Sequence, residues 1–521
     1  MVYLFGSSFT PDESTYGLVM AHILNGKPWP VFFYAQPYTG TQSAILAAFL
    51  AKAFGFWPYF LKLIPLVASV GLIWANYFLA KLIYKGKRQE WVGLTAALLT
   101  ALLPSFAQNW GVRAGSGYPE VVLVGSLCLI LGVGVLRAKP VTRAQHAAPL
   151  QWLVSIEGRF FVLGLLAGFG YWVQPAIVYY LLPLAFLIFL WEPKFFLKRW
   201  FHLALLGVII GAAPVIWFNI QNDLYTGRAL FAKPGGIKNA FLIFFTEGMP
   251  VILGTRASWS RVDHFLPLAV VVWVAYGVAF FVPAWDLLKR VAFLRQAGQA
   301  FHRVKGVKEV FLKDARVLLL LVVLVTPFIF AISPFNWFVV EPRYIYAPLY
   351  STLPVLLGGL LLVEIPKHRS YKSYMTYVLL VLVLASNLLS MTAPSRNSRP
   401  DSFETQTNLT PVIEFLRERN VHYVYSSFMF CHRLVFESQE DVICTPFEGG
   451  FGEVRYPQYK EMVVNAPKEE RGFVFLVRGG GEQETADNYT PALESCKEDT
   501  SQQNDPCHEQ IIGPFRVSWY R

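Results

Sequence analysis

Ten apolar runs constrain this chain more than any other feature of its sequence. A helix that crosses about 30 Å of hydrocarbon needs about 20 predominantly apolar residues. Because the bilayer core offers no water to backbone N–H and C=O groups, such runs must be helical. The sequence therefore predicts a polytopic α-helical membrane protein with about ten transmembrane helices, near residues 57–84, 91–108, 119–137, 159–173, 175–191, 201–219, 265–285, 315–333, 344–363 and 372–391.

The composition agrees with a membrane location. Of the 521 residues, 55% are hydrophobic and only 15% are charged, whereas a soluble domain carries about 25% charged residues. The net charge of +11 lies mostly in short loops between the apolar runs, where it reports orientation. It is therefore no sign of a nucleic-acid partner, and we expect membrane lipid to surround most of the chain.

Lysine and arginine divide unevenly between the two sets of loops. One set carries 21 of these residues and the alternating set, with the N-terminal segment, carries nine. The positive-inside rule places the richer set in the cytoplasm, which puts the N-terminal segment and the C-terminal tail outside. The richer loops lie near residues 85–90, 137–159, 192–200, 286–316 and 364–372, and the poorer segments near 1–56, 109–118, 220–264 and 334–343.

An outside N-terminus needs a means of delivery. Residues 1–10 contain no basic n-region and no adequate apolar h-region of a signal peptide. We therefore expect that a first transmembrane helix is missing from this chain, with a short native N-terminus as the alternative.

The tail reads as a separate domain. A polar linker, Pro394–Pro400, follows the last apolar run. Helical periodicity at 411–420 and strand-like patterns at 421–427, 442–447 and 472–479 then predict a small α/β fold. The expected organisation is a membrane domain over 1–391 and an extracytoplasmic α/β domain over 392–521.

Cysteine usage agrees with that location. Cys128 lies alone in an apolar run, whereas the tail holds the other four cysteines. An even number in an oxidising compartment predicts two disulfides. We favour Cys431–Cys444 and Cys496–Cys507, although three connectivities are open. Zinc binding with neighbouring histidines is the rival, but neither pair has the two-residue spacing of a zinc knuckle.

An adjacent carboxylate pair, Asp12 and Glu13, lies in the segment FTPDESTYG shortly before the first apolar run. Two carboxylates at a membrane border are costly unless water or chemistry retains them. The alternative is a helix N-terminus, where acidic residues favour the helix dipole. The pair therefore predicts either a catalytic site at the wet rim of the membrane or a helix cap.

Four segments together resemble the membrane glycosyltransferases of the GT-C fold, in particular the protein O-mannosyltransferases, the lipid A aminoarabinose transferases and related family-39-like bacterial enzymes. In that family one further helix precedes the Asp-Glu loop, which lies here within residues 1–56. The resemblance implies a protein of the bacterial inner membrane whose active site lies outside the cytoplasm. The order of the segments carries the resemblance: PDESTYGLVMAHILNGKPWP (11–30), FYAQPYTGTQSAILAAFLAKAFG (33–55), GVRAGSGYPEVVLVGSL (111–127) and EPRYIYAPLYSTLPVLL (341–357).

The resemblance implies transfer of a sugar, with inversion, from a polyprenyl-phosphate carrier to an acceptor hydroxyl on a glycan, a lipid or a protein. Because phosphate is already a good leaving group, one carboxylate suffices as the base that takes the acceptor proton. The matching position is Asp12, with Glu13 as support or as a contact to the acceptor. A glycosidase, in contrast, needs two opposed carboxyl groups.

The departing phosphate needs a permanent cation, which favours arginine. Arg343, beside Tyr344 at the outer mouth of an apolar run, is the first candidate and Arg113 is the second; either is alternatively a lipid-facing anchor. Glu120 forms part of the pocket or simply pairs with Arg113. Gln36 and Tyr38 are candidates for the sugar pocket or for an interfacial belt.

The long outer segment 220–264 either gates the lipid carrier or only covers the cavity. No phosphate-cradling glycine-rich loop is present, so we expect no nucleotide cofactor. A lone Asp-Glu pair is a poor cation site; we predict no metal, although oligosaccharyltransferases of this fold use a divalent cation.

Two other classes of function remain as alternatives. A secondary transporter or flippase would place ionisable residues near the membrane midplane and would usually show internal repeats. A structural subunit of an envelope assembly complex would need neither.

Overall fold

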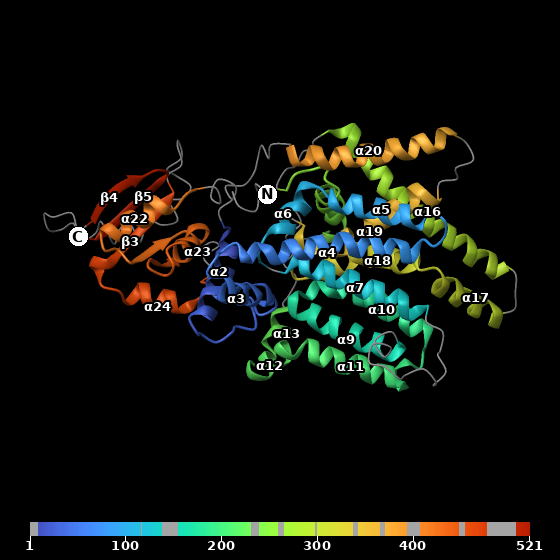
Figure 1. Ribbon diagram of the computed structural model, residues 1–521, viewed down its shortest axis with the longest axis horizontal. Coiled ribbons are helices and arrows are strands. Elements are labelled where there is room, and N and C mark those ends of the chain that lie inside the picture. The colour runs from blue at the N-terminus through green and yellow to red at the C-terminus, as the bar shows by residue number, and fades with distance from the viewer. Residues whose placement is uncertain are drawn as a thin grey trace. The chain divides into compact units, whose positions relative to one another are not determined.

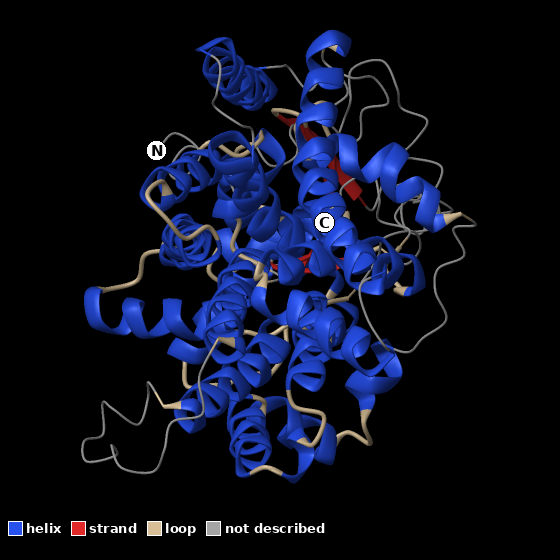
Figure 2. Ribbon diagram, turned by 90° about the vertical axis from the view of Figure 1, so that its right-hand side faces the viewer, coloured by secondary structure: helices blue, strands red, loops and turns tan. Residues whose placement is uncertain are grey.

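The computed structural model describes residues 9–115, 117–137, 155–230, 239–258, 265–296, 300–336, 342–364, 370–392, 407–447, 454–476 and 507–520. Helices dominate the described residues, and the strands form one small sheet (Figure 2). The chain divides into two compact units: unit 1 comprises Met1–Pro37, Thr41–Lys62 and Arg399–Arg521, and unit 2 comprises Tyr38–Gly40 and Leu63–Ser398.

Unit 2 is built from helices, several of them broken by short 3-10 or π turns. Its elements are α4 (Phe60–Ile83, which begins in unit 1), α5 (Gln89–Ala101), α6 (Ser105–Val112), α7 (Tyr118–Leu136), α9 (Ile156–Val173), η1 (Pro175–Ile177), α10 (Val178–Trp191), η2 (Phe195–Leu197), α11 (Arg199–Gly211), α12 (Ala213–Gln221), α13 (Tyr225–Leu230), α14 (Ala240–Ile243), η3 (Phe244–Gly248), α15 (Met249–Ile252), α16 (Leu266–Gln296), α17 (Ala300–Lys313), α18 (Arg316–Ile332), α19 (Arg343–Gly359), η4 (Leu360–Glu364) and α20 (Ser370–Thr392).

All ten predicted apolar runs are helical, but ten crossings are not confirmed. Six helices among the described residues are long and apolar enough to cross a membrane: α4, α7, α9, α16, α19 with η4, and α20. Two further runs are bent pairs, α5 with α6 at 78° and α11 with α12 at 66°, which would raise the number to eight. The remaining two runs, Pro175–Trp191 and Arg316–Ile332, fall in the class of shorter apolar helices. The predicted number of ten spans exceeds the six to eight found among the described residues because hydropathy does not reveal bends and short helices.

Helix α19 forms the core of unit 2. Residues 345–361 of its candidate span are all buried, in contrast to the other candidate spans, which are only partly buried. Serine and tyrosine hydroxyls join it to its neighbours: Ser126 Oγ lies 2.9 Å from Ser351 Oγ, which lies 2.7 Å from Tyr180 Oη. A fully packed α19 provides a rigid base for the residues at its N-terminus.

Glycines allow α9 and α11 to touch backbone to backbone, side by side (Figure 1). A Cβ atom on Gly164 would lie 2.0 Å from the carbonyl oxygen of Ala204, and one on Gly207 would lie 2.3 Å from that of Phe161. Both helices carry glycines four residues apart, the pattern that permits close helix packing in membranes. The close approach requires glycine at these positions.

Unit 1 combines N-terminal helices with the tail. Three parallel strands and two antiparallel strands form a sheet in the order β2-β1-β3-β5-β4. The elements are α2 (Pro11–Leu24), α3 (Gln42–Phe54), α22 (Thr410–Glu418), β1 (Tyr423–Ser426), α23 (Phe428–Glu437), β2 (Ile443–Pro446), α24 (Pro457–Asn465), η5 (Lys468–Glu470), β3 (Arg471–Leu476), β4 (Cys507–Ile512) and β5 (Phe515–Tyr520).

The predicted helix and three strands of the tail are confirmed within a few residues, and so is a small sheet-containing domain. The structure adds the N-terminal segment to this unit, whereas the sequence grouped that segment with the membrane region. Helix α2 packs against α23 so closely that a Cβ atom on Gly17 would lie 2.3 Å from the Phe436 ring. The predicted linker 394–400 lies outside the described residues.

Cys431 and Cys444 form a disulfide, as predicted, with their Cα atoms 5.2 Å apart. It joins α23 to β2, two elements that pack together. The second predicted pair cannot be followed, because Cys496 and the side chain of Cys507 lie outside the described residues. Cys128 is buried and free.

Candidate functional site

The carboxylate pair lies in the first turn of α2. Thr10 is the N-cap: its hydroxyl accepts from the Glu13 backbone N–H at 3.2 Å, and its own N–H donates to Glu13 Oε2 at 2.9 Å. This reciprocal arrangement is a capping box, which satisfies two otherwise unpaired backbone donors. Glu13 therefore has a structural task at the start of the helix.

Asp12, one residue earlier, points elsewhere. Its Oδ1 accepts a hydrogen bond from Arg455 Nη2 at 3.2 Å, and 31% of its side chain is exposed. Among the described residues, its Oδ2 oxygen makes no hydrogen bond or ion pair. Asp12 is thus a carboxylate held on one side and accessible on the other.

Arg455 reaches Asp12 from the tail, just before α24. Its side chain is only 5% exposed, and its guanidinium lies 5.0 Å from the Phe33 ring centroid and 5.5 Å from that of Phe428. With the Gln36 amide turned so that its oxygen faces the guanidinium, that oxygen accepts from Nη1 at 2.8 Å and Nη2 at 3.1 Å. The predicted pocket residue Gln36 therefore contacts Arg455.

Glu13 is held on its second oxygen as well. Lys62 Nζ lies 3.7 Å from Glu13 Oε1, with both side chains almost fully buried. The ammonium also lies 5.1 Å from the Phe9 ring centroid. A buried ion pair of this kind is costly to break, because one charge would remain without compensation. Its partners fix the position of Glu13.

The other end of α2 is anchored to the tail through His22. This buried side chain contacts Tyr34 Oη at 2.7 Å, and Glu440 Oε1 and Tyr459 Oη at 3.0 Å each. The hydrogen bond from His22 lowers the pKa of Glu440 to about 2, helped by Tyr459 and the charge of Lys27 and opposed by burial. Burial raises the pKa of Tyr459 and Tyr34. Together with Arg455, these contacts fix α2 at both ends.

In unit 2, the predicted cations gather around one indole. The guanidinium of Arg113 lies 5.0 Å and that of Arg343 5.5 Å from the Trp110 ring centroid. Arg343 is the first residue of α19, and Arg113 directly follows α6. A cation–π contact uses the face of a guanidinium, so it orients both arginines while leaving their N–H edges to other partners.

Aromatic rings extend this arginine cluster. The Tyr344 ring stacks on the Phe335 ring with 4.7 Å between their centroids. The Tyr38 ring centroid lies 5.1 Å from that of the same Phe335 ring. Tyr118, at the start of α7, lies 6.0 Å from Tyr344. Glu120 is buried in the same first turn of α7. The structure thus brings together Arg113, Arg343, Tyr344 and Tyr38 of the predicted residues.

The segment 220–264 is not a plain loop. Its described part contains α13 and the consecutive turns α14, η3 and α15, with a π-helical turn over Phe244–Gly248. Residues 231–238 and 259–264 lie outside the described residues.

Arg455 and Lys62 escaped the sequence analysis. Arg455 stands in an irregular stretch that no periodic pattern marks, and only the fold brings it to Asp12. Lys62 did leave a signal, since a lone lysine in the first turn of an apolar run is costly without a partner. Within the described part of the chain, no three His, Cys, Asp or Glu side chains gather in a way that could hold a metal ion.

Neither the family models nor the curated proteins contain a match to this sequence. Solved structures do match. Two structures of ArnT from Cupriavidus metallidurans, one bound to undecaprenyl phosphate and one in the apo state, align with TM-scores of 0.53 and 0.56. Each alignment covers 99% of this chain and 95% of that chain, at 13% and 11% sequence identity respectively. ArnT, the aminoarabinose transferase, is a GT-C membrane glycosyltransferase.

The chain has the GT-C fold. The resemblance seen in the four sequence segments is confirmed at the level of the fold, and it extends over both units. With its apolar helices, the GT-C fold makes this chain an integral membrane protein with several spans. Because a fold hosts more than one activity, the function depends on the chemistry of two groups of residues, Asp12 with its partners in unit 1 and the arginine cluster in unit 2.

Proposed function

We propose that this chain is an inverting glycosyltransferase that moves a sugar from a polyprenyl-phosphate carrier to an acceptor hydroxyl on the extracytoplasmic face of a bacterial inner membrane. The fold supports a lipid-linked sugar transferase in general, since one of the similar ArnT structures contains undecaprenyl phosphate. The observation that carries the proposal is the contrast within the carboxylate pair, in which Asp12 is accessible and Glu13 is occupied.

Asp12 is the proposed base. As the acceptor oxygen attacks the anomeric carbon, its proton passes to Asp12 Oδ2, the oxygen that Arg455 does not bind. The bond between the anomeric carbon and the phosphate oxygen breaks, and its electron pair leaves on the phosphate. Because phosphate needs no protonation to leave, a single carboxylate is sufficient.

Arg455 is the proposed positioning residue for that base. Its two aromatic neighbours and Gln36 fix the guanidinium, and the guanidinium fixes one oxygen of Asp12. Accurate placement of a reacting group contributes substantially to catalysis, and a displacement of about 1 Å can cost about 10²-fold in rate. The tail would then contribute directly to the reaction.

Arg343 and Arg113 are proposed to bind the carrier phosphate, with Tyr344 as a further donor. The planar guanidinium offers two parallel N–H groups to phosphate oxygens and keeps its charge at all relevant pH values. Arg343 stands at the N-terminus of α19, where the helix dipole also favours an anion. Tyr38 and Glu120 are proposed to line the sugar pocket.

Membrane vesicles separate this proposal from its rivals. Right-side-out vesicles from bacteria that produce the protein would receive radiolabelled polyprenyl-phosphate sugar, with vector-only vesicles and Asp12→Asn vesicles as controls. We expect label on a new product, identified by mass spectrometry, only with the intact protein. Passage of the label across the membrane while still on its carrier would show a flippase, and no change in the label would favour a structural subunit; both outcomes contradict the proposal.

A further inference from the structure

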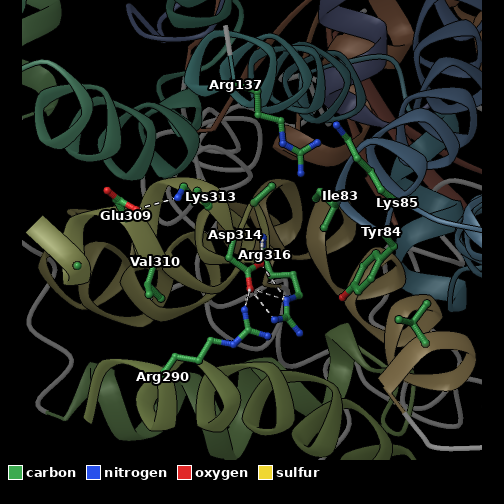
Figure 3. Close-up of a pocket in the computed structure, with 13 residues that line it drawn as sticks. Ile83, Tyr84, Lys85, Arg137, Arg290, Glu309, Val310, Lys313, Asp314 and Arg316 are labelled. Atoms are coloured by element: carbon green, nitrogen blue, oxygen red, sulfur yellow. Dashed lines mark hydrogen bonds and ion pairs between the residues drawn. The ribbon is translucent and has the colours of Figure 1, made fainter. Parts of the chain in front are cut away.

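A cavity of about 580 Å³, shown in Figure 3, lies in unit 2. It is at the end of α19 remote from Arg343. Val363, which lines it, is separated from Arg343 by the 21-residue span Arg343–Val363, about 30 Å at 1.5 Å per residue. The remaining wall comes from the ends of α4, α7, α16, α17 and α18. This cavity is therefore distinct from the arginine cluster.

One wall of the cavity is an ion-pair network whose charges balance. Arg316 Nη2 lies 2.5 Å from Asp314 Oδ2 and 2.7 Å from Asp286 Oδ2. Arg290 Nη2 lies 2.6 Å from the same Asp286 oxygen, and Nη1 lies 3.7 Å from Asp314 Oδ2. Two arginines and two carboxylates thus neutralise one another in this wall of the cavity.

Lys85 and Arg137 make the opposite wall positive. Both project toward the space above this network, from the ends of α4 and α7 (Figure 3). Arg137 donates to the backbone oxygen of Leu82. Neither side chain forms an ion pair with a carboxylate in the part of the chain that the structure describes. The cavity therefore presents two positive charges to an anion, that of Lys85 and that of Arg137, the second partly offset by the nearby Asp314 carboxylate.

The surroundings favour a lipid as the source of that anion. Ile83, Val310 and Val363 add apolar surface beside the charges. Four of the lining residues stand in or next to four of the five basic loops of the sequence: Lys85, Arg137, Arg316 and Val363. Basic groups at the end of transmembrane helices attract anionic headgroups, at about 1 kcal/mol per residue.

We propose that this cavity binds the phosphate headgroup of an anionic phospholipid, with Lys85 and Arg137 as the cations that hold it. The phosphate would lie between these two side chains, and the apolar wall would receive the glycerol and the first acyl carbons. The inference is independent of the proposed sugar transfer, because it concerns other residues at the other end of α19.

The test measures lipid binding to the purified full chain in neutral detergent. Short-chain phosphatidylglycerol would be titrated and its bound fraction followed by native mass spectrometry. We expect Lys85→Gln to raise the apparent Kd about fivefold, equivalent to about 1 kcal/mol, and Arg137→Gln to act in the same direction. Short-chain phosphatidylcholine should bind more weakly to the unaltered protein.

Lys87→Gln is the matched control, because it removes the same charge two residues away in the same loop without lining the cavity. It should leave the Kd within twofold of the unaltered protein. Equal losses for Lys85→Gln and Lys87→Gln would overturn the proposal. If inorganic phosphate displaced phosphatidylglycerol at equal concentration, the cavity would be a site for free phosphate, and the lipid assignment would be wrong. The Lys85 side chain is exposed, so Lys85→Gln should fold normally. The Lys85 variant therefore decides the test even if Arg137→Gln fails to fold.

Discussion

The carboxylates of unit 1 and the arginines of unit 2 are positioned by different forces. Asp12 and Glu13 are held by charges and hydrogen bonds that come from distant parts of the sequence, Arg455 and Lys62 respectively. Arg113 and Arg343 are instead oriented by the face of Trp110, which is close in sequence to Arg113. Each means of support suits a different chemical task.

A base must present one oxygen in one direction, and a hydrogen bond to its other oxygen achieves this. A phosphate-binding cation needs its charge and its N–H edges, which contact with an aromatic face preserves. A directional hydrogen bond therefore distinguishes Asp12, and contact with an aromatic face distinguishes the arginines.

The largest effect is expected from Asp12→Asn, which keeps the shape of the side chain but removes the base. The rate of sugar transfer should fall by about 10²–10⁴-fold, whereas donor binding should change little. The measurement is the initial rate of label transfer together with a donor-binding isotherm. Glu13→Gln is the matched control and should reduce transfer per folded molecule by less than about tenfold, because Glu13 caps α2 and pairs with Lys62, so its loss lowers stability and not the chemical step. A larger loss from Glu13→Gln than from Asp12→Asn would reverse the two roles.

Arg343→Lys should come next. It keeps the positive charge but loses the planar pair of N–H donors. A hydrogen bond to a charged group contributes about 1.5–3 kcal/mol, so donor affinity should fall by at least about tenfold, and turnover should fall with it. Donor binding measured by displacement of a fluorescent polyprenyl phosphate would show this. Arg113→Lys serves for comparison; unchanged donor affinity in both variants would remove the phosphate-binding assignment.

Arg455→Gln should lower turnover by about tenfold through misplacement of Asp12, with the KM for the donor unchanged. Arg455→Lys should recover part of the rate, since an ammonium can still reach Asp12. A purely structural role would instead lower the amount of folded protein without separating kcat from KM. Donor titrations on both variants, with thermal unfolding alongside, distinguish these two readings.

The smallest effect concerns the His22 end of α2. Because the folded-state pKa of Glu440 is about 2, below its ordinary value of 4.5, its ionised form stabilises the fold above pH 4.5. That stabilisation is lost as the pH falls from about 4.5 toward 2. Glu440→Gln should flatten this part of the stability curve, with differences in Tm of about 1 °C per kcal/mol for a chain of 521 residues. A Tm profile identical to that of the unaltered protein would show that the contact adds no stability.

The sequence was sufficient to predict where the helices lie along the chain but not where they bend. Apolar length predicted a helix at each of the ten runs, because a continuous apolar run of about 20 residues crosses lipid as a helix that pairs its own backbone groups. The bends after Ala101 and Gly211 depend on packing, which hydropathy does not record. Three of the five tail strands that the structure describes, β1 to β3, were predictable from short apolar patterns, whereas β4 and β5 were not predicted. Compartment and parity predicted disulfides among the tail cysteines, and Cys431–Cys444 was the favoured choice among three open connectivities.

The candidate site was predictable only in part. Asp12 and Arg343 stood out because a charge at a membrane border is unusual. The capping box follows a local pattern, Thr10 and Glu13 three residues apart, which a sequence displays. The partner of Asp12 left no such signal, because Arg455 arrives from more than 400 residues away. Long-range ion pairs leave no periodicity in a single sequence.

The central claim is that Asp12 acts as the only base in a single displacement at the anomeric carbon. The most direct test is the anomeric configuration of the product, determined by NMR after transfer from a donor of known configuration. The account predicts inversion, because Glu13 is held in the capping box and against Lys62 and the reaction has no covalent sugar intermediate. Retention of configuration, or a sugar covalently bound to Asp12, would contradict it.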